Sequence, residues 1–286
     1  MKNITVAAVQ MRCGTNMEEN LEKAERLVRE AAALGADLIL LPELFSRHYF
    51  CQERRYEYYE YAHPLEESPE VNYFIPIAGE LGVVLPISFY ERDKTRLFNS
   101  EAVIDADGSV LGVYRKTHIP DDHYYQEKFY FTPGDTGFKV WDTAFGRIGI
   151  GICWDQWFPE TARALALGGA QLLLFPTAIG SEPVLEVDSM PHWRRVMQGH
   201  AAANLMPVIA ANRTGSENVS PCKENGFQKS GLMFYGSSFI TDQTGEIIAS
   251  ASRDKEEILT AHFDLDVLEK ERLSWGLFRD RRPEMY

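Results

Sequence analysis

The sequence places a carboxylate, an ammonium and a thiol at the ends of three apolar segments. Glu43 closes the run LILLPE, Lys116 closes LGVYRK, and Cys153 closes GIGIC. A thiol attacks a carbonyl carbon well only as its thiolate, which a nearby ammonium favours and a carboxylate can generate by accepting the proton. The ammonium can also stabilise the resulting oxyanion, together with a backbone N–H. The three residues therefore predict acyl-transfer chemistry that needs neither histidine nor metal.

Each of these residues also has an ordinary structural interpretation. A single buried cysteine is most often part of a hydrophobic core. Glu43 alone could begin a helix, and Lys116 alone could be a solvated loop charge. The prediction therefore depends on the three together. The remaining cysteines, Cys13, Cys51 and Cys222, lack this context, and we interpret them as structural.

Buried strands that alternate with helices would position these three ends. Two further pairs of strands are predicted as hairpins, one turning at residues 107–108 and one around Gly245. Residues 116–136 and 213–230 are expected to be loops, and long loops at strand ends are where α/β folds hold chemistry. The strands outnumber those of one doubly wound sheet, so we expect two packed sheets with helices outside. Strands are expected at 4–11, 37–43, 83–90, 147–153, 170–176, 206–213 and 257–265, and helices at 21–34, 71–82, 159–169 and 190–205.

Length, composition and charge narrow the class of protein. A chain of 286 residues with 45% hydrophobic residues suits one large domain. A net charge of −13 argues against binding to a nucleic-acid backbone. No apolar run is long enough to span a membrane, and the four scattered cysteines show no zinc-site spacing. We expect a cytoplasmic protein with no cofactor, no metal, no membrane contact and no nucleic-acid partner.

Three segments, LLPELF, YRKTHIP and GIGICWD, resemble the signature motifs of the nitrilase superfamily of carbon–nitrogen hydrolases. The resemblance covers nearly the whole chain and implies a single domain, 1–286, with a four-layer α-β-β-α sandwich. It implies that Glu43 is the general base, Lys116 the oxyanion stabiliser or proton donor, and Cys153 the nucleophile. It also implies that Glu127 orients Lys116 or the substrate.

The residues around the nucleophile favour a cationic substrate. Family members that act on carbamoyl amino acids carry an arginine soon after the cysteine, whereas here the first arginine is Arg163. Glu182, which follows the next strand, could instead pair with a substrate ammonium. The segments KTHIPDDHYYQEKFYF, CWDQWFPE and LFPTAIGSEP resemble the branch of the family that hydrolyses N-carbamoylputrescine to putrescine, carbon dioxide and ammonia. That resemblance implies aromatic walls from Tyr49, Tyr125 and Trp154, and backbone contacts from Ala178.

Several alternatives remain open from the sequence. The chain could be another amidase of the family, such as an ω-amidase or a hydrolase of other carbamoyl amines or amino acids, or a true nitrilase. It could also be a non-catalytic protein that binds polyamines. If Glu182 does not hold the ammonium, Asp155, Glu186 and Asp188 are the next carboxylates to test. The tail at about 265–286 carries aromatic residues that we expect to join copies of the chain in a homo-oligomer.

Overall fold

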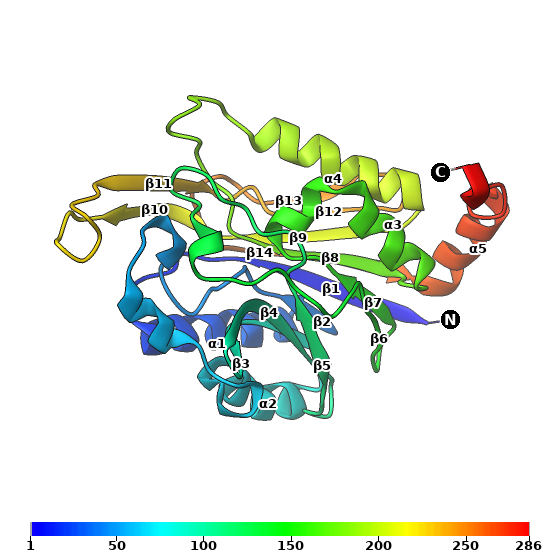
Figure 1. Cartoon of the computed structure of the whole chain (residues 1–286). Helices are drawn as coiled ribbons and strands as arrows, with labels where there is room; N and C mark the ends of the chain where they lie inside the picture. The colour runs from blue at the N-terminus through cyan, green and yellow to red at the C-terminus, as the bar shows by residue number, and fades with distance from the viewer. Residues whose placement is uncertain (1, 286) are drawn as a thin grey trace.

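The computed structural model describes residues 2–285, and all of its strands except β10 and β11 form two sheets packed face to face (Figure 1). The first sheet has the strand order β14-β1-β2 followed by β3-β4-β5, because Leu38 and Val84 join the two halves through a parallel bridge. The second sheet has the order β13-β12-β9-β8-β7-β6. The strands are β1 Asn3–Gln10, β2 Leu38–Leu40, β3 Leu85–Asp93, β4 Arg96–Ile104, β5 Val110–Arg115, β6 Val140–Asp142, β7 Arg147–Ile150, β8 Leu172–Thr177, β9 Val208–Asn212, β10 Thr214–Val219, β11 Ser230–Tyr235, β12 Phe239–Thr241, β13 Ile247–Ser250 and β14 Glu257–Asp264.

Helices cover the outer face of each sheet and complete the four layers. Helices α1 and α2 pack on the first sheet, and α3 and α4 pack on the second (Figure 1). A separate apolar cluster fills the space between the two sheets. The predicted α-β-β-α sandwich is therefore confirmed. The helices are α1 Met17–Ala33, α2 Pro69–Leu81, α3 Pro159–Leu167, α4 Met190–Asn204 and α5 Leu265–Trp275.

Local sequence accounts for where the first two helices begin and end. Helix α1 begins after Asn16, whose side chain accepts a hydrogen bond from the Glu18 backbone N–H. Helix α2 begins after Ser68, which accepts from the Val71 N–H, and it ends at Gly82 with φ at 66°. In α1, one face of apolar residues at helical spacing is buried against the sheet.

The segment 213–230, which we expected to be a loop, instead contains most of a two-stranded ribbon. Strand β10 pairs antiparallel with β11, and the loop is confined to 220–229. The prediction was wrong because the middle of β10, GSEN, is polar throughout, so the sequence shows no apolar alternation even though Glu217 points inward to Arg213. Residues 232–235 belong to this ribbon, and the hairpin around Gly245 consists of β12 and β13 alone.

The strands that precede the candidate catalytic residues end on one side of the sandwich. Glu43 follows β2, Lys116 follows β5, and Cys153 follows β7. Strand β8 runs parallel to β7 and leads to Ala178 and Glu182. Within residues 2–285, no helix is both long and apolar enough to cross a membrane.

Candidate active site

A buried lysine joins two of the predicted acids. The Lys116 Nζ lies 2.8 Å from Glu43 Oε1 and 2.6 Å from Glu127 Oε2. All three side chains are at most 1% exposed. Glu43 Oε1 also accepts a hydrogen bond from Asn99 Nδ2 at 2.7 Å, whereas its Oε2 has no partner among the described residues. One oxygen of Glu43 is thus fixed by two donors, and the other is free to take a proton.

Burial and pairing act in opposite directions on these charges. Burial alone would lower the pKa of Lys116, but the carboxylates of Glu127 and Glu43 outweigh it and raise that pKa well above its usual value. Burial raises the pKa of Glu127 to about 7, with Lys116 opposing the shift. Lys116 therefore stays a cation, as an oxyanion stabiliser must.

Cys153 lies on a tight turn directly after the second sheet's β7 strand. Its φ is 41°, a left-handed value that is uncommon for residues with a side chain and that recurs at functional turns. Gly151 allows this close packing, because a Cβ there would lie 2.7 Å from the Phe175 ring and 2.9 Å from Thr161. The alternating Ile148 and Ile150 fill the apolar layer between the sheets.

The thiol is held in a setting that favours its neutral form at rest. Burial, followed by the charge of Glu43, raises the pKa of Cys153 well above its usual value, and Lys116 opposes that shift. The Sγ lies 3.9 Å from the carbonyl oxygen of Ala178. A thiol of this kind must lose its proton as it attacks, so its chemistry requires a base such as Glu43.

Asp155 is a structural part of the nucleophile's turn. Its carboxylate accepts hydrogen bonds from the Ile152 N–H at 3.0 Å, the His118 N–H at 2.9 Å and the Tyr114 hydroxyl at 2.7 Å. Because it is 0% exposed and fully occupied, it is not available to a substrate ammonium. Its inclusion among the alternative anchors was wrong: it ties the segment after Lys116 to the turn of Cys153.

A cavity of about 200 Å³ opens directly onto the thiol. Four of the five predicted substrate-binding residues line it: Tyr125, Trp154, Ala178 and Glu182. The remaining lining residues are Pro120, Asp121, Asp122, Glu127, Cys153, Trp157 and Ile179. The lining thus combines apolar walls with carboxylates and contains no lysine or arginine.

Tyr49, the fifth predicted contact, lies behind the cavity. Its side chain is 0% exposed and is not part of the lining, and its hydroxyl donates to Glu127 Oε1 at 2.7 Å. The expectation of an aromatic wall at this position was wrong, because the hydroxyl satisfies a buried carboxylate instead. Tyr49 and Lys116 hold the two oxygens of Glu127 from opposite sides.

The two other alternative anchors also lie elsewhere. Glu186 lines a surface cavity beside β10 and β11 that shares Glu182 with the inner cavity but does not reach Cys153, and Asp188 pairs with Arg253 at 2.7 Å. Glu182 is half-buried and forms no ion pair with any described residue. Burial, reinforced by the charge of Asp122, raises the pKa of Glu182 to about 7.

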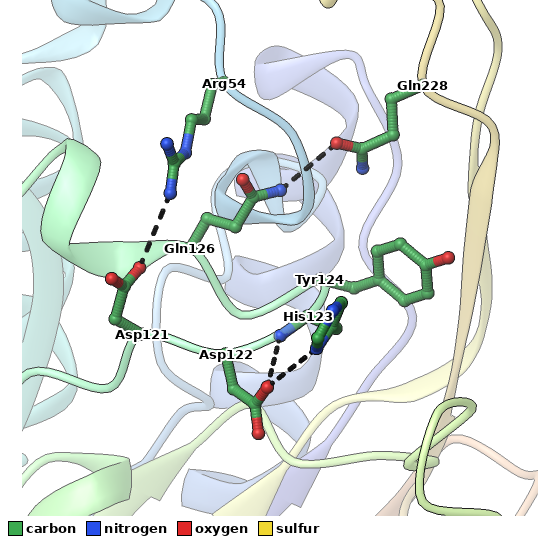
Figure 2. Close-up of a pocket in the computed structure, with 7 residues that line it drawn as sticks. All are labelled: Arg54, Asp121, Asp122, His123, Tyr124, Gln126 and Gln228. Carbon is green, nitrogen blue, oxygen red and sulfur yellow. Dashed lines mark hydrogen bonds and ion pairs between the residues drawn. The ribbon is translucent and has the colours of Figure 1, made fainter.

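An outer cavity of about 360 Å³ adjoins the first, and Asp121 and Asp122 line both. Figure 2 shows Arg54 reaching toward Asp121, at 3.9 Å, while Asp122 accepts from the backbone N–H of His123 at 2.7 Å. Asp122 remains 62% exposed. The mouth of the inner cavity is therefore acidic and open to solvent.

Comparison with known proteins shows where the chain belongs. Its sequence matches the carbon-nitrogen hydrolase family over residues 5–272. The chain belongs to the carbon–nitrogen hydrolase family. It is 53% identical to an N-carbamoylputrescine amidase of Arabidopsis thaliana, with 100% of this chain and 94% of that protein covered. It is 54% identical to a citrullinase of Francisella tularensis, with 100% and 98% covered.

A solved structure gives the same result for the fold. The carbon-nitrogen hydrolase from Helicobacter pylori G27 is 38% identical, with a TM-score of 0.90 over 99% of this chain and 97% of that one. The protein is therefore an amidase-type enzyme of this family, and the alternative of a non-catalytic polyamine-binding protein is set aside.

Sequence reasoning missed two residues that position the base of this carbon–nitrogen hydrolase. Asn99 binds Glu43, and its position inside strand β4 was a usable signal, because asparagine is disfavoured in strands. Arg213 is 0% exposed and donates to the backbone carbonyls of Glu43 and Leu44 at 2.9 and 2.8 Å. No local pattern signals that contact, since the residues are 170 positions apart.

The described residues contain no group of three or more His, Cys, Asp or Glu side chains that could hold a metal ion. Lys116 supplies a positive charge beside the nucleophile. The site can therefore combine a base, a cation and a thiol at the inner end of one cavity, with carboxylates at its mouth.

Proposed function

We propose that this carbon–nitrogen hydrolase converts N-carbamoylputrescine to putrescine, carbon dioxide and ammonia. The observation that carries the proposal is the lining of the inner cavity, which contains the buried Cys153 and the half-buried Glu182 and has no basic side chain. A linear substrate with a ureido group at one end and an ammonium at the other matches that distribution of charge. The plant relatives named as N-carbamoylputrescine amidases, at 52–53% identity, support it.

The first half of the reaction forms a covalent intermediate. Glu43 accepts the thiol proton as Cys153 Sγ attacks the ureido carbonyl carbon, and Lys116 with the Trp154 backbone N–H holds the oxyanion. The tetrahedral species collapses by breaking the bond to the terminal nitrogen. Glu43 returns the proton to that nitrogen, and ammonia leaves. The S-carbamoyl enzyme retains the diamine chain.

The second half releases the product. Glu43 takes a proton from water, whose oxygen attacks the same carbon, and the C–S bond breaks as the thiol is restored. The released carbamate loses carbon dioxide and leaves putrescine. Glu127 does not exchange protons in this scheme: held by Tyr49 and Lys116, it keeps the ammonium of Lys116 in place.

Citrulline is the second candidate substrate, because a relative that is 54% identical is a citrullinase. Citrulline carries an α-carboxylate in addition to its ammonium. In this cavity that carboxylate would meet Asp121, Asp122 and Glu182 with no lysine or arginine in the lining to neutralise it. Like charges at close range are strongly unfavourable, so the lining favours the diamine.

The test is kcat/KM on a panel of N-carbamoylputrescine, citrulline, N-carbamoylbutylamine, an ω-amide and a nitrile. We expect N-carbamoylputrescine to exceed citrulline by about 30-fold or more, the low end of the cost of an unpaired buried charge. Equal or faster turnover of citrulline would overturn the substrate assignment. Preference for the ω-amide or the nitrile would instead identify another branch of the family.

We further expect a cytoplasmic homo-oligomer that serves polyamine biosynthesis. All four cysteines are free, as suits a reducing compartment. Leu273 and Trp275 on α5 are 73% and 71% exposed, which is unusual for large apolar side chains and fits a contact between copies. Light scattering on the purified protein tests this, with loss of the oligomer expected on Trp275→Ser.

A further inference from the structure

Glu101 is a buried carboxyl group that the proposed mechanism does not use. It lies in strand β4, is 0% exposed, and neither of its side-chain oxygens has a hydrogen-bond partner among the described residues. An ionised carboxylate in such a place is very costly in free energy, so the group takes up a proton instead. Burial, reinforced by the charge of Glu43, raises the pKa of Glu101 well above its usual value.

The strand places Glu101 next to Asn99, which binds the catalytic base. Asn99, two positions earlier, shares its face of β4, and side chains two apart on a strand stand about 6.5 Å from each other. Asn99 is the residue that donates to Glu43 Oε1 at 2.7 Å. Across the sheet, Glu101 is in register with Ser88 of β3 and Tyr114 of β5.

Three neighbouring side chains leave buried oxygens unpaired. Glu43 Oε2, Asn99 Oδ1 and both oxygens of Glu101 have no partner among residues 2–285. Such groups are normally satisfied by protein or by internal water, and an internal water needs two to four polar partners. The Glu43 and Asn99 oxygens can only accept, so a water that donates to both has its own oxygen left to accept a hydrogen bond from a third group. Neutral Glu101 can donate that bond through its O–H.

The other polar groups near Glu101 and Glu43 are already engaged. Lys116, after β5, donates to Glu43 and Glu127, and the Tyr114 hydroxyl donates to Asp155. The Ser88 hydroxyl, from β3, accepts the Leu44 N–H. Of the carboxyl groups, Glu43 is the one whose charge acts on Glu101.

We propose that Glu101 is a positioning residue for Glu43, remaining a neutral acid and donating to it through one internal water. The proposal rests on the role of Glu43 as the base, given above. A hydrogen bond to the ionised form of a carboxylate lowers its pKa. Glu101 therefore keeps Glu43 ready to accept the thiol proton, and it does so without adding a negative charge beside it.

The protonation state is tested directly by infrared spectroscopy on the full-length protein at neutral pH. The difference spectrum between the wild type and Glu101→Gln should contain the carbonyl band of a protonated carboxyl group. If the difference shows only carboxylate bands, Glu101 is ionised and the proposal is wrong. This measurement requires no substrate.

The effect on Glu43 is tested by the pH dependence of Cys153 alkylation with iodoacetamide, which also does not depend on the carbamoyl substrate. In Glu101→Met, loss of the donor should make the ionised form of Glu43 less stable. The acid limb of the profile, the range over which the alkylation rate falls as the pH is lowered, should then move up by about one pH unit, and the rate below it should fall about tenfold. Glu101→Gln should restore the wild-type limb, because its amide N–H replaces the O–H. Val103→Ala, on the same face of β4, is the matched control for lost packing and should lower the melting temperature without moving the limb.

Two outcomes would overturn the proposal. If Glu101→Met folds and the acid limb of its alkylation profile lies at the same pH as in the wild type, Glu101 only fills space. If the acid limb of the alkylation profile moves to lower pH in Glu101→Gln, the substitution has removed a negative charge, and Glu101 is ionised in the wild type. If Glu101→Met does not fold, the proposal is still tested by two measurements on Glu101→Gln. These are the infrared difference spectrum and the pH dependence of Cys153 alkylation. If N-carbamoylputrescine is not the preferred substrate of the panel but these results are obtained, the substrate assignment is wrong and the role of Glu101 still holds.

Discussion

At the inner end of the substrate cavity the charged side chains are buried and paired, whereas the carboxylates at its mouth are more exposed and only weakly paired. Lys116 lies between Glu43 and Glu127 with all three side chains at most 1% exposed. Glu182, by contrast, has no ion-pair partner among the described residues, and the charge of Asp122 disfavours its ionisation. The ion pairs of the inner end are thus formed before the substrate binds. The negative charge at the mouth, by contrast, is neutralised only when a cationic substrate enters.

This difference separates the groups that act on the reacting carbon from those that select the substrate. A preorganised set of buried charges needs no rearrangement during the reaction, which is the condition for strong stabilisation of a transition state. Carboxylates at a mouth, remote from the reacting carbon, stabilise the bound substrate and the transition state about equally. Changes at the inner end should therefore lower kcat, and changes at the mouth should raise KM.

The largest effect is expected for Cys153→Ser. The hydroxyl has a much higher pKa than the thiol, so kcat should fall by at least about 10³-fold while the fold is retained. Steady-state kinetics and circular dichroism measure both. Intact-mass analysis should place an electrophile on Cys153, with Cys222→Ser as a control that behaves like the wild type. Inactivation with the label on Cys51 or Cys222 would contradict the assignment.

Glu182→Gln should weaken substrate binding at the mouth of the cavity and leave the catalytic residues unaffected. Loss of a desolvated charge pair costs about 2–5 kcal/mol, so kcat/KM for N-carbamoylputrescine should fall about 30-fold or more, mostly through KM. N-carbamoylbutylamine, which has no ammonium, is the control and should be nearly unaffected. If both substrates lose equally, Glu182 is a structural residue and the division between the two ends does not hold.

The pH dependence of KM should follow the ionisation of Glu182. Because the pKa of this carboxyl is raised to about 7, it is mostly neutral at lower pH and binds an ammonium poorly there. KM for N-carbamoylputrescine should therefore fall by up to about tenfold between about pH 6 and about pH 8. Glu182→Gln should abolish this trend. A KM that rises over this range in the wild type would have the wrong sign.

Asp122→Asn should give a smaller change. This side chain is 62% exposed, and exposed charges contribute only about 0–1 kcal/mol, so kcat/KM should fall less than about fivefold. Because Asp122 raises the pKa of Glu182, the midpoint of the KM profile should also move to lower pH. An effect as large as that of Glu182→Gln would make Asp122 the principal ammonium ligand.

No change is expected when metal ions are removed. Lys116 provides the charge that would otherwise require a metal, so dialysis against a chelator should leave kcat unaltered. Activity that is lost in chelator and recovered with a metal ion would show that the inner end is incomplete without it.

The sequence by itself determined the layered fold and predicted the residues at the inner end of the cavity. Glu43, Lys116 and Cys153 each follow an apolar strand, and strand periodicity is a local property that can be read along the chain. Glu127 was identified by its resemblance to a family motif. The structure brings Lys116 into contact with both acids, and it places the thiol beside the same cavity as Glu127.

Only the tertiary structure decided which way several side chains point. Tyr49 was expected on the cavity wall, yet it lies behind Glu127; an aromatic residue in a loop can face either side, and here an unpaired carboxylate oxygen decided it. Asp155 was considered for the mouth and instead holds the turn of the nucleophile. Such choices depend on hydrogen bonds between residues far apart in the chain, as between Arg213 and the Glu43 backbone, which no local pattern encodes.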